Sequence, residues 1–189
     1  MDLKNKTIIL TGAARIGQEV AKNLKEKGAN LVMTYLNSQS ETGSFGLAVK
    51  ADVSKKEDVA NVVNKAKEKF KRIDCLIHMA SIYEKSEWKD LKEENWNKNI
   101  NVIAKSAFLM AKAVGDELLK NQPDNLIKGK LIFISDWSVL RNPYKDHLPY
   151  NIAKSAVVGL TLSLAKELAP EITVNCIAPG PTIKPADLT

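Results

Sequence analysis

Six short runs of apolar residues alternate along the chain with longer stretches in which apolar residues recur every three or four positions. The runs predict β-strands over residues 6–11, 30–36, 47–51, 74–79, 130–135 and 172–177. The longer stretches predict helices over residues 55–70, 94–121 and 150–169, and an early helix that ends at Gly28. This alternation predicts an α/β fold in three layers, with a doubly wound parallel sheet in the strand order 3-2-1-4-5-6 and helices on both faces.

The composition is that of one globular domain. The 189 residues are enough for a single α/β core, and 44% of them are hydrophobic and 26% charged. No apolar run is long enough to span a membrane, and the N-terminus leads directly into a strand, so we expect a cytoplasmic protein without a membrane partner. The net charge of +6 arises from basic and acidic residues mixed on helices, which does not favour a nucleic-acid partner. Two histidines and two cysteines are too few to predict a metal site.

A glycine-containing turn joins the first strand to the first helix. This order is the context that a dinucleotide-binding loop requires, because small residues let the backbone approach a pyrophosphate and the helix N-terminus offers free N–H groups. The candidate cofactor-binding residues in the turn are Gly12, Arg15, Ile16 and Gly17. Two glycines alone are weak evidence, and they also fit an ordinary turn.

The second strand bears on the kind of dinucleotide. No acidic residue follows this strand, where a carboxylate would bind a ribose 2′-hydroxyl. Arg15 lies in the glycine turn instead, and Asn37 and Ser38 follow the strand. A positive charge without an acid favours the 2′-phosphate of NADP(H), and the alternative is an arginine that is merely solvated.

Tyr150 and Lys154 are four residues apart in the last predicted helix, which places both side chains on one face. A phenol has a reference pKa of about 10, and a neighbouring ammonium lowers the pKa by stabilising the phenolate. The pair can therefore exchange a proton with a carbonyl or an imine. In isolation such a pair is more often two surface residues, so its meaning depends on the rest of the chain.

Two further polar residues occupy informative positions. Asp136 leaves the carboxyl end of the fifth strand, where ligands bind in open α/β sheets. Asn101 lies within the helix predicted over residues 94–121, where asparagine is mildly unfavourable. It is either an exposed polar residue or the site of a functional kink.

Taken in order, these motifs resemble the short-chain dehydrogenase/reductase family over nearly the whole chain. The resemblance rests on Thr11-Gly12…Gly17, Asp52-Val53, His78-Met79-Ala80-Ser81 in place of the family's Asn-Asn-Ala-Gly, Asn101, Tyr150 with Lys154, and Pro179-Gly180. The family has a Rossmann-type fold and catalyses hydride transfer between NAD(P) and carbonyl or related groups.

The resemblance implies a role for each matching residue. Tyr150 would be the acid/base, Lys154 would lower its pKa and hold the nicotinamide ribose, and Asn101 would support a proton-relay water. The implied cofactor-binding residues are Gly12, Arg15, Ile16, Gly17, Asn37, Ser38, Asp52, Val53, Ala80, Ser81, Tyr150, Lys154, Pro179 and Gly180. Family members usually pair through two helices, here those around Phe108 and Ala156, which implies a homodimer or a homotetramer.

Asp136 is a departure from the family pattern. It aligns with the usual catalytic serine, and Ser138 comes two positions later. An aspartate here, together with Arg-Ile-Gly at the end of the glycine turn, is similar to the pteridine reductase and dihydromonapterin reductase branch. The resemblance therefore implies an NADPH-dependent reductase of a pterin-like small molecule in which Asp136 is catalytic. The alternatives are a general carbonyl or 3-oxoacyl reductase and a nucleotide-binding relative without activity.

Three stretches are shorter than in the family. The glycine turn lacks one residue, and residues 38–46 are too few for the crossover helix that parallel neighbouring strands normally need. The family also continues beyond Pro179-Gly180 through a substrate-covering segment and a final strand. We interpret residues 1–189 as a single NAD(P)-binding domain of a longer chain from which these stretches are missing. The alternative is a shortened, inactive relative.

Overall fold

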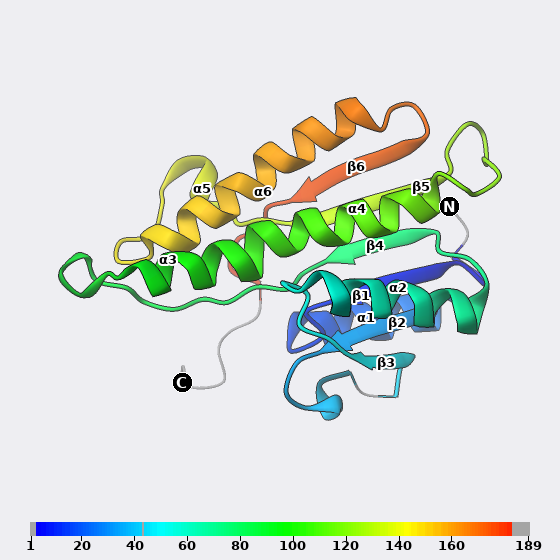
Figure 1. Cartoon of the computed structure of the whole chain (residues 1–189), viewed down its shortest axis with the longest axis horizontal. Coiled ribbons are helices and arrows are strands. Elements are labelled where there is room, and N and C mark those ends of the chain that lie inside the picture. The colour runs from blue at the N-terminus through cyan, green and yellow to red at the C-terminus, as the bar shows by residue number, and fades with distance from the viewer. Residues whose placement is uncertain (1–2, 43, 183–189) are drawn as a thin grey trace.

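The computed structural model describes residues 3–42 and 44–182, and it confirms the predicted parallel sheet (Figure 1). The strands are β1 (Thr7–Thr11), β2 (Asn30–Tyr35), β3 (Leu47–Lys50), β4 (Cys75–His78), β5 (Gly129–Ile134) and β6 (Ile172–Ile177). They pair in parallel in the order β3-β2-β1-β4-β5-β6. The apolar runs predict them well because strands covered on both faces need apolar residues along most of their length.

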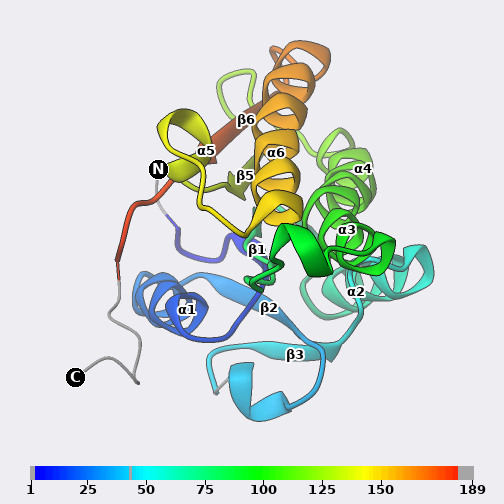
Figure 2. The same cartoon turned by 90° about the vertical axis from the view of Figure 1, so that its left-hand side faces the viewer.

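Helices cover both faces of the sheet, which gives the three predicted layers (Figure 1, Figure 2). They are α1 (Ile16–Glu26), α2 (Lys56–Phe70), α3 (Glu93–Asn99), α4 (Ser106–Leu118), α5 (Ser138–Arg141) and α6 (Leu148–Glu167). Alternate strand residues point to opposite faces. Ile8 and Leu10 of β1 therefore belong to the cluster that includes Ala21 of α1, whereas Ile9 belongs to the larger cluster with residues of α2, α4 and α6.

The long helix predicted over residues 94–121 is interrupted. It consists of α3, a π-helical segment η3 (Ile100–Lys105) and α4. The backbone N–H of Ser106 bonds to the carbonyl of Asn101, five residues back, which is the spacing of a π-turn. Periodicity alone does not separate the three segments, but the interruption lies at Asn101, the position for which a functional kink was one of two interpretations. Such turns are frequent at functional sites.

The connection between β2 and β3 contains a short 3-10 helix, η1 (Gln39–Thr42), in place of a crossover helix. The two strands still pair in parallel, with Val32 opposite Leu47 and Tyr35 opposite Lys50. A connection of this length therefore suffices here, because β3 is short and lies at the edge of the sheet.

Candidate active site

The predicted site residues gather at one edge of the sheet. Because the strands run parallel, their carboxyl ends meet at that edge, where ligands bind in open α/β sheets. The predicted residues follow the strand ends in this way: Gly12, Arg15, Ile16 and Gly17 after β1, Asn37 and Ser38 after β2, Asp52 and Val53 after β3, Ala80 and Ser81 after β4, Asp136 after β5, and Pro179 and Gly180 after β6. Tyr150 and Lys154 come from α6, and Asn101 comes from η3, which packs against α6.

Tyr150, Lys154 and Asp136 form the centre of the site. α6 begins at Leu148 with Pro149 in its first turn, so Tyr150 and Lys154 lie one turn apart. Both side chains are on the buried face of the helix, with exposures of 6% and 4%. The Tyr150 hydroxyl donates to Asp136 Oδ2 at 2.6 Å, and the Lys154 ammonium lies 5.9 Å from the centroid of the Tyr150 ring. Tyr150 and Asp136 are thus in direct contact, and Lys154 lies beside the Tyr150 ring.

The electrostatics of Tyr150 differ from the prediction. Burial and the hydrogen bond to the Asp136 carboxylate raise the pKa of Tyr150 above its ordinary value, because both disfavour the phenolate. The Lys154 ammonium donates to the Ile134 carbonyl at 2.8 Å, and burial lowers the pKa of Lys154 to about 8. The net direction of the Tyr150 pKa is therefore upward, opposite to the predicted one, because burial and the carboxylate bonded to the phenol both raise it. The site holds Tyr150 as a protonated acid.

Asp136 occupies the position beside Tyr150 that the resemblance assigns to a serine. Its other oxygen, Oδ1, accepts the backbone N–H of Ser138 at 2.9 Å, which orients the carboxylate. The Ser138 hydroxyl is buried and has no hydrogen-bond partner within the described part of the chain. The Ser135 hydroxyl donates to the Lys154 carbonyl. In this structure neither serine is the partner of Tyr150.

The turn after β1 fits a dinucleotide because its two glycines have no side chains. Gly12 has a φ of 71°, and a Cβ here would lie 2.6 Å from the carbonyl carbon of Met79. A Cβ on Gly17 would overlap the Gly12 carbonyl oxygen. The turn therefore passes directly over the end of β4, and α1 begins at Ile16 without a side-chain cap. N–H groups at such an uncapped helix N-terminus are suited to bind a pyrophosphate.

Arg15 and Asp52 differ in whether their charged groups are bonded to other residues. Arg15 is exposed at the N-cap of α1, and its guanidinium forms no ion pair with any described residue. The Asp52 carboxylate, in contrast, accepts the Ser54 hydroxyl at 2.7 Å, and this hydrogen bond lowers the pKa of Asp52. Arg15 is therefore available to a ligand, whereas Asp52 is held by the turn that precedes α2.

An aromatic cluster adjoins Tyr150. The Tyr83 ring stacks on His147 with centroids 4.4 Å apart and meets the Tyr150 ring edge-on at 5.0 Å. Tyr144 meets Tyr83 edge-on at 5.8 Å, and its hydroxyl accepts from Trp137 Nε1 at 3.2 Å. Sequence reasoning missed Tyr144 and His147, because they belong to no motif and only their closeness to Tyr150 in the chain gives a signal.

The other predicted residues lie near the centre of the site but do not bond to Tyr150, Lys154 or Asp136. The side-chain amide of half-buried Asn101 makes no hydrogen bond to another described residue. The backbone N–H of Ala80 donates to the Thr11 hydroxyl, and the carbonyl of Pro179 accepts the N–H of Trp137. Among the described residues there is also no group of three histidine, cysteine or carboxylate side chains that could hold a metal ion.

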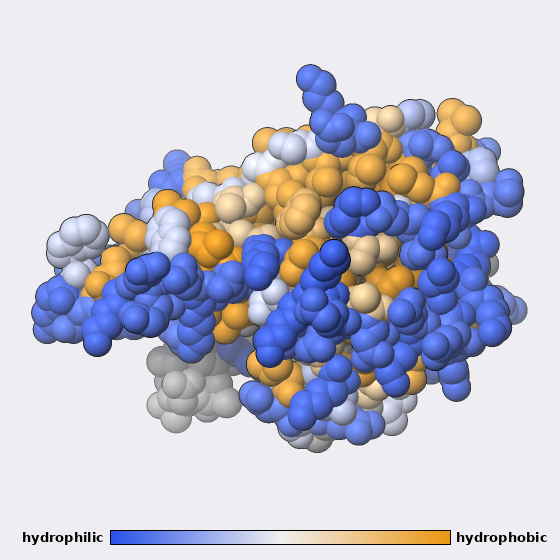
Figure 3. All heavy atoms as spheres, in the orientation of Figure 1, coloured by the Kyte–Doolittle hydropathy of each residue, from blue (hydrophilic) through white to orange (hydrophobic). Residues whose placement is uncertain are grey.

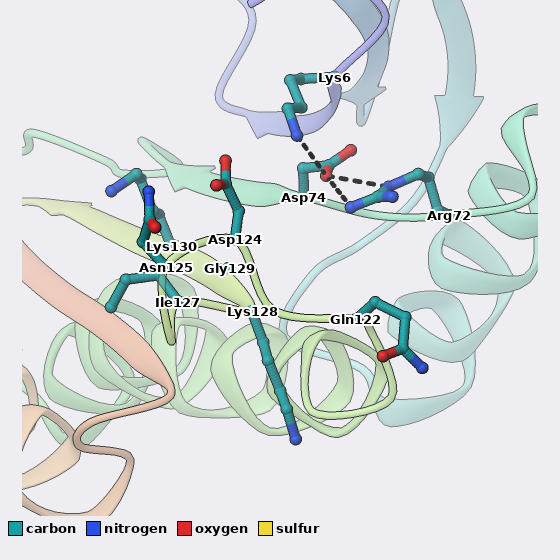
Figure 4. Close-up of a pocket in the computed structure, with 10 residues that line it drawn as sticks. All are labelled: Lys6, Arg72, Asp74, Gln122, Asp124, Asn125, Ile127, Lys128, Gly129 and Lys130. Carbon is teal, nitrogen blue, oxygen red and sulfur yellow. Dashed lines mark hydrogen bonds and ion pairs between the residues drawn. The ribbon is translucent and has the colours of Figure 1, made fainter. Parts of the chain in front are cut away.

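A separate hollow of about 420 Å³ lies at the opposite edge of the sheet (Figure 4). Its lining includes Lys6, Asp74 and Lys130, which lie at the amino ends of β1, β4 and β5. Asp74 Oδ1 accepts Arg72 Nη2 at 2.6 Å and lies 3.7 Å from Lys6 Nζ. The lining contains none of the predicted site residues, so this hollow is distinct from the candidate active site.

The strand order, the glycine turn and the buried Tyr150–Lys154 pair define a class of nucleotide-dependent oxidoreductases. A family model described as "Enoyl-(Acyl carrier protein) reductase" matches residues 12–187. Oxidoreductase UcpA of Salmonella typhimurium is 34% identical over 190 residues, which cover 94% of this chain and 70% of that protein. An NAD-dependent glycerol dehydrogenase of Listeria innocua is 32% identical over 186 residues, with coverages of 94% and 71%. A 3-oxoacyl-[acyl-carrier-protein] reductase of Synechocystis is 31% identical over 191 residues, with coverages of 94% and 74%.

Solved structures agree with these matches. A dehydrogenase/reductase from Sinorhizobium meliloti is 25% identical with a TM-score of 0.87, over 96% of this chain and 74% of that one. A short-chain dehydrogenase/reductase from Serratia marcescens is 27% identical with a TM-score of 0.85, over 96% and 76%. The chain belongs to the short-chain dehydrogenase/reductase family, whose members use a nicotinamide cofactor. No helix in the described ranges is both long and apolar enough to cross a membrane.

Proposed function

We propose that this protein is an NADPH-dependent reductase of a small molecule of the pterin class, with Tyr150 as the proton donor. The observation that carries the proposal is the 2.6 Å hydrogen bond from the Tyr150 hydroxyl to Asp136 Oδ2. A bound nicotinamide supplies the hydride, which is added to the carbon of a C=N bond. The protein supplies the proton, which is added to the nitrogen.

Tyr150 is suited to give this proton. Its raised pKa keeps the phenol protonated at neutral pH, and burial protects it from bulk water. A substrate nitrogen that gains negative charge takes the proton from the phenol in the transition state. The Lys154 ammonium, 5.9 Å from the ring centroid, then stabilises the phenolate until solvent returns a proton. The Asn101 amide is available to hold a water on that route.

Asp136 favours a substrate that presents N–H groups. A carboxylate only accepts hydrogen bonds, and it offers about four lone-pair sites, of which Tyr150 and Ser138 use two. The remaining sites match two adjacent N–H donors, such as those on the amino-pyrimidine edge of a pterin. The Tyr83 ring, 58% exposed and edge-on to Tyr150, offers a face on which a flat ring can stack.

A second candidate is the reduction of a 3-oxoacyl thioester. The names of relatives favour it, because 3-oxoacyl-[acyl-carrier-protein] reductases of Synechocystis and Staphylococcus epidermidis are 31% and 29% identical. In this chain the Asp136 carboxylate would adjoin the ketone oxygen, and two acceptors next to each other repel. Because of this repulsion, we rank reduction of a 3-oxoacyl thioester as the second candidate function.

Arg15 favours NADPH over NADH. A guanidinium binds a phosphate with two parallel hydrogen bonds, and Arg15 is exposed without an ion pair among the described residues. Asn37 and Ser38 follow β2 where an NAD-binding protein would carry an acid. The relative from Listeria innocua is named an NAD-dependent glycerol dehydrogenase, so relatives of this chain include a user of the other cofactor.

We expect NADPH to be oxidised faster with a dihydropterin than with an acetoacetyl thioester, and faster than NADH with either. Arg15→Ala is expected to raise the KM for NADPH by about tenfold or more and to leave the KM for NADH unchanged, because it removes a charge-assisted contact. The matched control is Lys22→Ala, which removes an exposed cation from the same helix. Faster turnover of the thioester would replace the pterin proposal by the second candidate, and equal use of NADH would overturn the cofactor assignment.

The outer faces of α4 and α6 carry exposed apolar side chains (Figure 3). Phe108 is 50% exposed, Ile152 44% and Leu162 70%. We propose that a second copy of the chain covers them, as a homodimer or the pair within a homotetramer. Glutamate at both Phe108 and Leu162 is expected to give monomers by light scattering at micromolar concentration, whereas Leu126→Glu, in the connection between α4 and β5, is not. A monomeric unmodified protein would contradict the proposal.

A further inference from the structure

His78 ends β4 at a position where the family motif has an asparagine, and the proposed reaction does not use it. The residue is 3% exposed, and its two ring nitrogens contact two different elements. Nδ1 lies 2.9 Å from the hydroxyl of Thr11, the last residue of β1 before the glycine turn. Nε2 lies 3.0 Å from the hydroxyl of Ser106, where the π-helical segment η3 passes into α4. The imidazole therefore spans the distance between the cofactor turn and η3.

The direction of the hydrogen bond at Thr11 follows from counting donors. The backbone N–H groups of Met79 and Ala80 are directed at Thr11 Oγ1 at 3.1 and 3.2 Å, and the Met79 N–H is shared with the Thr11 carbonyl at 3.2 Å, so both lone pairs of the hydroxyl oxygen face a donor. The hydroxyl hydrogen is then the group left for a further hydrogen bond, so the Thr11 hydroxyl donates to His78 Nδ1. Nδ1 must therefore be the unprotonated ring nitrogen.

The contact at Ser106 gives the same answer independently. The Ser106 hydroxyl donates to the Val102 carbonyl at 2.6 Å, and a carbonyl can only accept. Since the single hydrogen of Ser106 is used in that bond, its oxygen accepts from His78 Nε2–H. Both ends of the imidazole thus require the same tautomer, with the proton on Nε2.

A charged His78 does not fit between these partners. An imidazolium would present a third donor to Thr11 Oγ1, which already accepts two. Burial and the nearby positive charge of Lys154 lower the pKa of His78 to about 3, so the ring is neutral at physiological pH. The ring also meets Phe133 edge-on, with centroids 6.2 Å apart, which restricts its rotation.

We infer that His78 is a positioning residue: its neutral Nε2–H tautomer ties the glycine turn to η3 and so fixes Asn101 relative to the bound cofactor. The two ends of the link serve different parts of the site. Thr11 precedes Gly12, whereas Ser106 closes the turn that carries Asn101.

The kinetic test uses Ser106→Ala, which cuts the link at η3 without touching the cofactor turn. It rests on the proposed function, and we expect kcat to fall by about tenfold to a hundredfold while NADPH affinity stays the same, because a displaced site residue acts on the reaction and not on cofactor binding. The matched control is Ser155→Ala. Ser155 makes the same bond to a carbonyl four residues back, in α6, but does not contact His78.

Two measurements test the link without an assay of activity. In ¹⁵N-histidine NMR spectra, the ring nitrogens of His78 are expected to keep the Nε2–H pattern from about pH 5 to 8. The NMR signals of His147, identified by their loss in His147→Gln, are used to tell the two histidines apart. In hydrogen-exchange mass spectrometry, Ser106→Ala is expected to accelerate exchange across residues 100–105 at least tenfold relative to Ser155→Ala.

Each result decides a separate point. A His78 that titrates in this range, or that carries its proton on Nδ1, overturns the hydrogen-bond chain even if the enzyme is active as proposed. Unchanged exchange across η3 in Ser106→Ala overturns the tie between the two elements. A protein inactive on both substrate classes overturns the proposed function, while the NMR and exchange results still decide the link. Accelerated exchange in Ser106→Ala combined with a kcat equal to that of Ser155→Ala removes the positioning role.

Discussion

Replacing Tyr150 by phenylalanine is expected to lower kcat by about 10²–10⁴-fold with every reducible substrate, because the variant lacks the group that gives the proton. The ring remains and can keep its packing against Tyr83, so cofactor affinity is expected to change little. The change also leaves Asp136 Oδ2 without the hydroxyl that donates to it. The rate of NADPH oxidation under saturating substrate measures the loss.

Tyr83→Phe is the matched control for this experiment. It removes a hydroxyl from the same aromatic cluster and keeps the stacked and edge-on ring contacts. We expect its kcat to stay within about threefold of the unmodified protein, since a surface substitution of this kind removes no proton donor. A Tyr150→Phe variant that is as active as Tyr83→Phe would show that the proton comes from another group.

Asp136→Ser is expected to change which substrate is reduced. The serine hydroxyl can bond to a ketone oxygen but cannot accept from two N–H groups at once, so dihydropterin reduction should fall by about 10–100-fold relative to reduction of an activated ketone. The pKa of Tyr150 should also fall, because the carboxylate that helps to raise it is gone. The ratio of the two kcat/KM values is the quantity to compare.

Asp136→Asn tests whether the charge of the Asp136 side chain or its shape determines which substrate is reduced. It keeps the size of the side chain but loses the negative charge and half of the accepting capacity. If the carboxylate recognises the substrate, the asparagine variant should lose dihydropterin activity as the serine variant does, because its amide nitrogen donates where the carboxylate accepts. If the ratio is the same in Asp136→Ser as in the unmodified protein, the pterin assignment is wrong and the general carbonyl reductase takes its place.

The sequence predicts the scaffold better than the chemistry. Apolar runs identify the strands because both faces of a parallel sheet are buried, as Ile8 and Ile9 illustrate by packing into opposite layers. Parallel strands then bring the residues that follow them to one edge, so motifs far apart in sequence can be placed together. The catalytic assignments of Tyr150, Lys154 and Asp136 depended on the resemblance and on that shared edge.

What the sequence did not predict depends on distances that spacing cannot give. Lys154 is one turn from Tyr150, but its ammonium bonds to the Ile134 carbonyl, while Asp136, fourteen residues from Tyr150, bonds to the phenol. Burial of the phenol and its hydrogen bond to Asp136 together raise the pKa of Tyr150, and spacing in the sequence shows neither. Asn101 was likewise open to two interpretations, because an asparagine within a helical pattern can be either an exposed polar residue or the site of an interruption.

The central place of β1 in the sheet has a consequence for how the chain folds. β1 pairs with β2 soon after it in sequence, but its other neighbour, β4, follows about 67 residues later, where Asp74 accepts the Thr7 N–H. During synthesis one side of this strand, whose three central residues are apolar, therefore stays unpaired until β4 emerges, and open strand edges promote association between chains. Pairing of β1 with β4 also closes a longer loop than pairing with β2, and contacts distant in sequence slow folding.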